Sequence, residues 1–339
     1  MKNFTKGLVL VAIMLGVIPI LPLIGDAVGY HSGEEKYGTD ENLESVEAIS
    51  NNYRDALDDV RVYDEVNGRV EAIKIEDFLM QAVLGSVSPE AEDELLQAQA
   101  VLMYTYIIGK RDSDADNSGL PENADIGRDS TKYLRLISEE EAKMLYGDMA
   151  IIYIKKVKAA VRACLGEYLS YGGKPIAVAY CYSSGGQTES SLNVMGEDLP
   201  YLKSVECGYD RECKSEAVFT ADELFAMLST GDKPLTILGS EEQWLEITKT
   251  TETGYVLEVT VDESETISGV ELAALLGLPS AKFTLNYSKE LNRFIFNIYG
   301  FGHLMGLSQY GGNEMAKKGA KHKEILLYFF PGSTLEKVN

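Results

Sequence analysis

The feature that most constrains the fold of this 339-residue chain is a segment, residues 95–107, that is apolar on two faces of a predicted helix. A surface helix needs only one apolar stripe, so a second apolar face requires protein on both sides of the helix. The sequence therefore predicts a helix that lies inside a core built by several other elements. The residues of the two faces are Leu95, Ala98, Leu102 and Tyr106, and Leu96, Ala100, Met103 and Ile107.

The segments around this helix alternate between strand and helix patterns. Residues 61–75, "RVYDEVNGRVEAIKI", alternate on both sides of Asn67-Gly68, which is typical of a β-hairpin. Residues 76–87 have a helical pattern that ends near Gly85. Further helices are expected at 139–147 and 151–166, and strand-like runs flank Gly172-Gly173. This mixture predicts an α+β fold.

The domain organisation predicted from these patterns is one principal mixed domain at residues 53–339. A smaller inserted α/β module is expected at residues 217–299, because capping boxes and two further hairpins occur there without interruption. Thr220 with Glu223 and Ser268 with Glu271 form the two predicted capping boxes.

The N-terminus predicts attachment to a membrane. Residues 1–25 combine two lysines with the apolar run "LVLVAIMLGVIPILPLI", which is near the length of a spanning helix. A signal anchor is favoured over a cleaved signal peptide because no A-x-A-like site precedes Gly25-Asp26. Two prolines and the terminal position disfavour a core helix. Residues 26–52 are polar and acidic and predict a flexible tether, which places the following domain outside the cytoplasmic membrane.

The net charge of the chain narrows the classes of possible partner. The chain has 53 acidic and 31 basic residues, a formal charge of −22, which excludes nucleic acid as a partner because binding nucleic acid needs a basic surface.

The cysteines at 164, 181, 207 and 213 permit disulfides outside the membrane, but the sequence does not decide their pairing, and all four can equally be free. Cys164 and Cys181 are expected on neighbouring strands.

Glu90, in "GSVSPEAED", has two interpretations. Ser88 is a good N-cap and Pro89 a good first helical residue, so Glu90 is expected in the first turn of a helix. There a carboxylate is stabilised by the helix dipole, and an exposed first-turn glutamate is the commoner explanation. The other interpretation is catalysis, which the local pattern alone does not favour.

Three stretches in order resemble the stage II sporulation protein D family, over roughly residues 60–338. They are "FLMQAVLGSVSPEAEDELLQAQAV", "EYLSYGGKPIAVAYCYSSGGQTESS" followed by "MGEDLPYLKSV", and "GFGHLMGLSQYGGNEMAKKGAKHKEILLYFFPGSTL". The resemblance implies a membrane-anchored, single-pass lytic transglycosylase with a groove for an extended glycan. Such an enzyme cleaves peptide-free peptidoglycan strands between MurNAc and GlcNAc and forms 1,6-anhydro-MurNAc. It implies forespore engulfment beside a partner amidase and endopeptidase, and no cofactor.

The resemblance also implies functional residues. The catalytic glutamate of the family lies five residues after a glycine, and counting from Gly85 gives Glu90 as acid and base. The stretch before residue 97 is about four residues shorter than in the family, so Glu92 and Glu94 are alternatives. For each substrate contact the alternative is structural hydrogen bonding. The implied contacts are Gln97, Gln99, Ser184, Thr188, Tyr201, His303, Ser308, Gln309 and Tyr310.

The chain also departs from the family. Gln97, Tyr104 and Leu304 stand where the family often has lysine, arginine and glycine. The positions of a family zinc site hold Pro121, Gly127 and Tyr133, which predicts no metal there. These departures motivate the main alternative, a glycan-binding scaffold of the same fold without cleavage. A membrane-anchored sensor and a thiol hydrolase, with Cys164 or Cys181 beside His303, are weaker alternatives.

Overall fold

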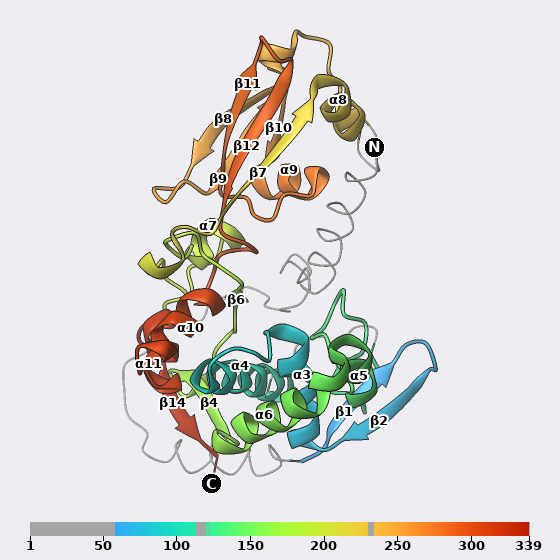
Figure 1. Ribbon diagram of the computed structural model, residues 1–339, viewed down its shortest axis with the longest axis vertical. Helices are drawn as coiled ribbons and strands as arrows, with labels where there is room; N and C mark the ends of the chain where they lie inside the picture. Colours follow the sequence, from blue (N-terminus) through green and yellow to red (C-terminus); the bar gives the residue numbers. More distant parts are fainter. Residues whose placement is uncertain (1–57, 113–119, 122, 230–233, 339) are drawn as a thin grey trace, which may run out of the picture. The chain divides into compact units, whose positions relative to one another are not determined.

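The computed structural model describes residues 58–112, 120, 121, 123–229 and 234–338, and the fold is α+β with open sheets (Figure 1). The chain divides into two compact units. The first comprises Met1–Val178, Ala316–Leu327 and Gly332–Asn339, and the second comprises Ala179–Met315 and Tyr328–Pro331. The predicted anchor at 1–25 and tether at 26–52 lie outside the described residues. Within the described ranges, no helix has the length and apolarity that crossing a membrane requires.

The first unit begins with the predicted hairpin. Strand β1 (Val60–Asp64) pairs antiparallel with β2 (Arg69–Ile73), and Asp64 lies opposite Arg69 across the turn. Gly68 has a φ of 63°, the left-handed conformation that the Asn-Gly turn requires. Strand β3 (Ile126–Gly127) joins the other edge of β1 in parallel. The hairpin prediction is confirmed.

Four helices build the core of the first unit: α3 (Ile75–Ser86), α4 (Asp93–Asp112), α5 (Glu139–Tyr146) and α6 (Ala150–Ala163). Helix α4 packs against α3 and α6 and against strand β4 (Glu167–Tyr171). Its two apolar faces are buried as predicted, with only Tyr106 partly exposed. The central helix thus lies between several elements.

Gly85 is needed where α3 approaches the chain near Arg135. A Cβ added at residue 85 would lie 2.0 Å from the carbonyl oxygen of Arg135, which no side chain could tolerate. The backbone N–H of Ile137 donates to the carbonyl of Gln81 at 3.1 Å, which fixes the same crossing. The glycine from which the catalytic position is counted therefore has a packing role.

The predicted helix start at Ser88 is wrong. Helix α4 begins at Asp93, and residues 87–92 form a turn instead. The hydroxyl of Ser88 accepts the N–H of Glu90 at 3.3 Å and its carbonyl accepts the N–H of Ala91 at 3.1 Å. Serine therefore stabilises a local turn in place of a helix cap. Glu90 is a turn residue, so the helix-dipole argument does not apply to it.

The first unit also contains a small sheet with the strand order β14-β4-β5, formed by β14 (Thr334–Lys337) and β5 (Lys174–Pro175) on either side of β4. The Gly172-Gly173 turn joins β4 to β5, as the sequence predicts. The prediction for Cys164 is wrong, because this residue follows the last turn of α6 and belongs to no strand. Its N–H continues the helical bonding to Val161.

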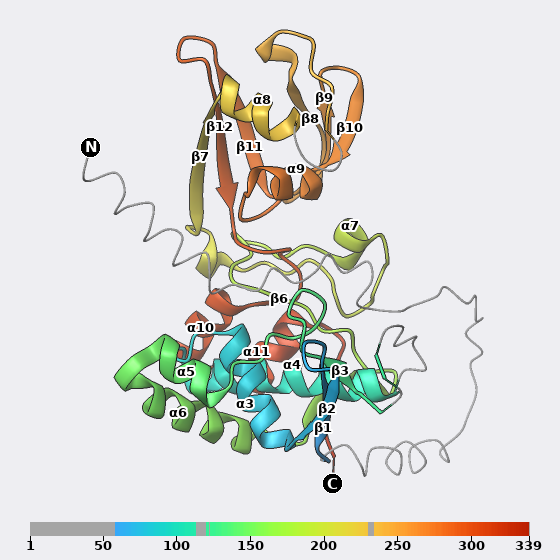
Figure 2. The same cartoon turned by 90° about the vertical axis from the view of Figure 1, so that its right-hand side faces the viewer.

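The second unit contains two three-stranded antiparallel sheets (Figure 2). One has the order β11-β12-β7, from β11 (Phe283–Ser288), β12 (Arg293–Tyr299) and β7 (Lys214–Thr220). The other has the order β10-β9-β8, from β10 (Glu265–Ser268), β9 (Val256–Val261) and β8 (Leu245–Thr250). Helices α8 (Ala221–Ser229) and α9 (Gly269–Leu276) complete this part.

A hydrophobic core joins these sheets and helices. The rings of Trp244 and Phe294 stack at 5.7 Å with an interplanar angle of 8°, and Leu224, Val256 and Phe296 are fully buried around them. The predicted hairpins β8–β9 and β11–β12 are confirmed. Residues 217–299 fall within the second unit, and their status as an inserted module stays a prediction.

The glycine-rich loops of the second unit are brought together by a short parallel pair. Strand β6 (Tyr180–Cys181) pairs with β13 (Leu307–Ser308), which is followed directly by α10 (Gln309–Lys317). Bridges between Ser183 and Phe301 and between Glu189 and Met305 continue the pairing. The loop "SSGGQTESS" therefore lies beside "GFGHLMG", although more than 100 residues separate them in sequence.

Candidate functional site

Glu90 is an exposed side chain on the turn between α3 and α4. The hydroxyl of Tyr153, on α6, donates to Oε1 of Glu90 at 2.7 Å. Lys156, one turn further along α6, donates to the carbonyl of Ala91 at 2.5 Å and holds the backbone of the turn. Among the described residues, Oε2 of Glu90 has no hydrogen-bond partner. The carboxylate of Glu90 is therefore held in place through one of its two oxygens.

The hydrogen bond to Glu90 also affects Tyr153. It raises the pKa of the Tyr153 hydroxyl, with smaller contributions from burial and from the charges nearby. The phenol therefore keeps its proton at neutral pH and acts as the donor. The ring of Tyr146 meets that of Tyr153 edge to face at 5.3 Å, which supports its orientation.

The two alternative glutamates, Glu92 and Glu94, have different structural roles. The carbonyl of Glu92 accepts the first N–H bond of α4, from Leu95 at 3.0 Å, so Glu92 lies at the helix start. Glu94 accepts bonds from Lys321 Nζ at 2.8 Å and from the backbone N–H of His322 at 2.9 Å. Burial favours a raised pKa of Glu94, but these bonds outweigh it and lower the pKa. A carboxyl held as an anion is poorly suited to act as an acid.

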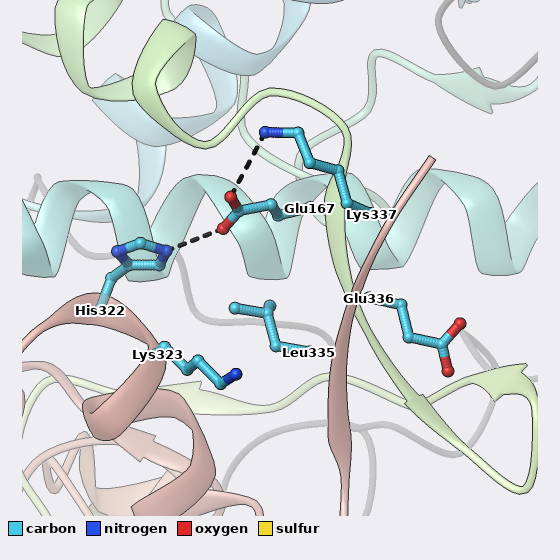
Figure 3. A pocket seen from close by; sticks show the side chains of 6 residues that line it. All are labelled: Glu167, His322, Lys323, Leu335, Glu336 and Lys337. Carbon is cyan, nitrogen blue, oxygen red and sulfur yellow. Dashed lines mark hydrogen bonds and ion pairs between the residues drawn. The ribbon is translucent and has the colours of Figure 1, made fainter. Parts of the chain in front are cut away.

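A pocket of about 280 Å³ lies next to this ion cluster (Figure 3). The Nε2 of His322 lies 2.8 Å from Oε2 of Glu167, and Nζ of Lys337 lies 3.4 Å from Oε1. The carboxylate of Glu167 is thus paired by its own neighbours. None of the predicted site residues lines the pocket. The lining residues are Glu167, His322, Lys323, Leu335, Glu336 and Lys337.

Gln97 and Gln99 lie on different faces of α4, as their spacing requires. Gln99 is fully buried, whereas Gln97 is partly exposed. Tyr104, where the family often has arginine, is buried in the same helix, and burial raises the pKa of its hydroxyl to about 12. Of these three side chains, only Gln97 reaches the surface of the unit.

In the second unit, a fully buried carboxylate joins two of the sequence motifs. Asp210 accepts the N–H of Ser184 at 2.6 Å, the N–H of Gly186 at 2.7 Å and the hydroxyl of Ser308 at 2.6 Å. The hydroxyl of Ser184 is also within 3.0 Å. Ser184 and Ser308 therefore both have internal partners. The structure brings together two predicted residues through a third that the sequence did not single out.

Thr188 is likewise buried and bonded within the unit. Its hydroxyl accepts the N–H of Val205 at 2.8 Å, and its carbonyl accepts the hydroxyl of Ser204 at 2.6 Å. These bonds hold the loop against the segment that carries Tyr201, which is half-buried. A role of Thr188 in contacting substrate stays a prediction, whereas its role in shaping the loop is visible.

Aromatic side chains are exposed on the second unit. The ring of Tyr310 lies 6.4 Å from that of Tyr182, and Tyr182 lies 6.1 Å from Phe301, both in edge-on contact. Tyr182 and Tyr310 expose 47% and 37% of their surface, so their rings are accessible. Gln309, next to Tyr310, is buried. Sequence analysis identified Tyr310 and missed Tyr182, although its alternation with Tyr180 was visible.

His303 is a neutral hydrogen-bonding residue in this structure. Its Nδ1 accepts the N–H of Met305 at 3.0 Å, which places the proton of the neutral ring on Nε2. Burial lowers the pKa of His303 to about 4. Among the described residues, the buried Nε2 has no hydrogen-bond partner. The ring can donate a hydrogen bond but is a poor proton carrier at neutral pH.

The cysteines do not support a thiol hydrolase. None of the four is disulfide-bonded. Burial raises the pKa of Cys164 and of Cys207 to about 12, and it raises the pKa of Cys181 well above the usual value. The thiolate is the nucleophilic form, and it is disfavoured at all three positions. The described residues contain no group of three side chains suited to a metal ion.

Comparison with known proteins shows which family this chain is similar to. Residues 63–171 match the family model described as stage II sporulation protein. A stage II sporulation protein D from Bacillus amyloliquefaciens is 26% identical over 327 residues, which cover 96% of this chain and 93% of the relative. One from Bacillus subtilis (strain 168) is 28% identical over 284 residues, covering 83% and 79%. The chain therefore contains a stage II sporulation protein domain at residues 63–171 and is similar to stage II sporulation proteins D over most of its length.

These similarities support a role related to the cell wall in sporulation. An amidase enhancer from Bacillus subtilis (strain 168) is also similar, at 23% identity over 290 residues, 71% of this chain and 38% of the relative.

One departure from the family pattern is visible in the backbone. Leu304, where the family often has glycine, is fully buried and has a φ of 65°. The leucine therefore keeps a left-handed conformation that favours glycine. The N–H of Glu189 donates to the carbonyl of Leu304 at 2.8 Å. This bond holds the two loops together at residue 304.

Glu189 is a buried carboxyl that sequence analysis did not single out. It accepts bonds from Asn193 Nδ2 at 3.0 Å and from the hydroxyls of Thr251 and Thr253, in the turn between β8 and β9. Burial raises the pKa of Glu189, although the bonds from Asn193 and Thr251 act in the opposite direction. Glu189 thus connects the glycine-rich loop to the neighbouring sheet.

Proposed function

We propose that the chain is a membrane-anchored lytic transglycosylase of peptidoglycan, with Glu90 as its acid and base. Its substrate is a peptide-free glycan strand, cut between MurNAc and GlcNAc in forespore engulfment. A partner amidase and endopeptidase would remove the stem peptides first. Similarity to stage II sporulation proteins supports the cell-wall role. The single observation that carries the residue assignment is the exposed carboxylate of Glu90, held through one oxygen by Tyr153.

The proposed reaction requires a single carboxyl group. The carboxylic acid protonates the glycosidic oxygen as the bond from that oxygen to C1 of MurNAc breaks. The 6-hydroxyl of the same MurNAc then attacks C1 and gives its proton back to the carboxylate. A 1,6-anhydro ring forms, and the second sugar leaves with a free hydroxyl. Hydrolysis by contrast usually needs two carboxyl groups, one of which activates water or attacks the sugar.

The contacts of Glu90 suit this scheme better than those of the neighbouring glutamates. Tyr153 fixes one oxygen, and the other can face the glycosidic bond. A bound glycan strand would cover Glu90 and exclude water from the glycosidic bond. Glu94 is held as an anion by Lys321 and His322, and Glu92 begins a helix.

The second unit supplies features suited to sugars. The accessible rings of Tyr182 and Tyr310 can stack on the apolar faces of pyranose rings. His303 holds the backbone of its loop at Met305 through Nδ1, and its buried Nε2 is out of reach of a sugar at the surface. Asp210 holds the loops beneath these groups in one geometry.

The test uses the full chain with peptide-free glycan strands and detects 1,6-anhydro-MurNAc ends by mass spectrometry. Glu90→Gln should lower the rate by at least about 100-fold, the usual contribution of a general acid. Glu92→Gln is the matched control in the same surface segment and should retain activity. Full activity in Glu90→Gln would sink the assignment. Loss in both variants would point to the segment's shape instead of the carboxyl.

A glycan-binding scaffold without cleavage is the second candidate. The exposure of Glu90 favours it, because a catalytic acid is commonly enclosed by its protein. Leu304 in place of glycine is the second observation. The scaffold is supported if glycan strands bind to the chain with no anhydro product, while a stage II sporulation protein D from Bacillus subtilis cleaves them in the same buffer.

A further inference from the structure

The corner between α5 and α6 exposes an unusual concentration of apolar side chains. Helix α5 ends at Tyr146, and the short 3₁₀ helix η2 (Gly147–Met149) leads directly into α6. Five large apolar residues within nine positions are exposed by 43% to 78%. They are Met144, Leu145, Met149, Ile151 and Ile152, called the α5–α6 corner below. Figure 2 shows these two helices side by side, as their contacts require.

Single exposed apolar residues are ordinary, but a cluster of this kind marks an interaction surface. The buried side of α6 already has its core partners, since Ile154, Val157 and Val161 are buried. Ile151 and Ile152 therefore contribute nothing to the core of the unit. A cluster of exposed aliphatic side chains lowers the solubility of a protein, which indicates that another molecule covers the α5–α6 corner.

The charges near the α5–α6 corner indicate which occupant. Residues 143–156 contain Lys143, Lys155 and Lys156 and only one acidic residue, Asp148, in a chain with a net charge of −22. Lys156 pairs with Asp93 at 3.8 Å, whereas Lys143 and Lys155 are exposed, so two exposed lysines accompany the apolar side chains. The acidic residues at the start of α5 lie at its opposite end, where Glu139 pairs with Lys158 at 2.9 Å. Aliphatic side chains flanked by lysines suit an anionic lipid surface.

The residue types of the α5–α6 corner also favour a bilayer over a protein as the partner of this surface. Strong protein interfaces are centred on tryptophan, tyrosine and arginine. The α5–α6 corner instead has methionine, leucine and isoleucine, which can insert among acyl chains without leaving a polar group unpaired. In addition, the sequence predicts a membrane anchor at residues 1–25 and a tether at 26–52. A flexible linker of that length spans roughly 30 Å, so a bilayer is within reach.

We propose that the α5–α6 corner docks the first unit on the surface of an anionic bilayer. Ile152 precedes Tyr153, whose hydroxyl holds Glu90, so docking would position the candidate carboxylate close to the membrane. Cleavage is then directed to the glycan strands nearest the bilayer. The inference rests on the proposed membrane attachment, and it does not depend on the proposed chemistry.

The experiment measures contact of single residues with lipid chains. The full chain is reconstituted in vesicles of phosphatidylglycerol and phosphatidylcholine with brominated acyl chains, which quench tryptophan by contact. The chain has one tryptophan, Trp244, which is buried and gives the background. Ile151→Trp and Met144→Trp probe the α5–α6 corner. Val66→Trp is the matched control, an apolar residue of the same unit that is 93% exposed on the β1–β2 turn.

Quenching at residues 144 and 151 should exceed the Trp244 background at least twofold, and quenching at residue 66 should equal it. Equal quenching at 66, 144 and 151 in vesicle-bound protein would overturn the docking and leave the membrane attachment standing. Failure of the chain to sediment with vesicles would overturn both. Burial of the new tryptophans without quenching would show that a protein surface covers the α5–α6 corner, and would also overturn the proposal.

Discussion

The hydroxyl of Tyr153 donates a 2.7 Å hydrogen bond to Oε1 of Glu90, from a helix 63 residues further along the chain. This contact connects the candidate carboxylate to the rigid core of the first unit. Without it, the exposed side chain of Glu90 would sample several rotamers, and only a fraction would present the carboxyl productively. The contact therefore makes a direct prediction about orientation.

Tyr153→Phe should lower the rate of glycan cleavage by about tenfold, because the carboxyl loses its orienting donor. The free energy of unfolding should change by less than about 1 kcal/mol, since the lost bond is exposed. Steady-state rates and denaturant unfolding measure the two effects. Tyr146→Phe is the control, because it keeps the ring contact to Tyr153. An unchanged rate in Tyr153→Phe would contradict an orienting role.

Asp210→Ala should destabilise the protein by about 3–5 kcal/mol. The change leaves the buried N–H groups of Ser184 and Gly186 without their acceptor, and a lost buried partner is costly. Urea unfolding followed by tryptophan fluorescence reports this, since Trp244 lies in the same unit. Asp198→Ala is the control, at an exposed ion pair with Lys203 that should contribute below about 1 kcal/mol. Equal effects of both changes would refute the structural role.

Because of Glu94, the free energy of unfolding should decrease at acid pH. Its pKa is lowered in the folded state, so it stays ionised where the unfolded carboxyl is already protonated. The stabilisation is therefore present above the unfolded pKa of about 4.3 and is lost as the pH falls through the lower folded value. Glu94→Gln should cost about 1 kcal/mol at pH 7 and much less at pH 3.

Unfolding measured at a series of pH values checks this prediction. Glu92→Gln, in the same helix start, serves as the control and should track the unmodified protein at every pH. A Glu94→Gln deficit that stays constant from pH 7 to pH 3 would show that packing, and not charge, explains its effect.

At residue 304, replacement by glycine should give a more stable protein than replacement by alanine, which reverses the usual order of the two replacements. Both replacements lose buried contacts, but at a φ of 65° alanine retains the strain of a left-handed residue, which glycine does not. Leu304→Gly should therefore be more stable than Leu304→Ala by about 1 kcal/mol. At Leu307, which is equally buried and lies in strand β13, alanine should be the more stable. The same order at both sites would mean that residue 304 is not strained.

The sequence alone determined the elements whose signals are local. Asn67-Gly68 predicted a hairpin because few other residue pairs adopt its turn, and the two apolar faces at 95–107 predicted a central helix because they had to be buried. The signal at Ser88-Pro89 failed because the same serine geometry stabilises a turn as readily as a helix start. The resemblance to the stage II sporulation protein D family also came from the sequence, through three motifs in order, and the comparisons agree with it.

Tertiary structure decided which side chains share a site. Nothing local to "GYDRE" shows that Asp210 joins Ser184 to Ser308, because that contact spans 98 residues and depends on the pairing of β6 with β13. Tyr153 was likewise an ordinary helical residue until packing brought its hydroxyl to Glu90. Local patterns determine backbone conformation residue by residue, whereas the partners of a carboxylate depend on how distant segments pack.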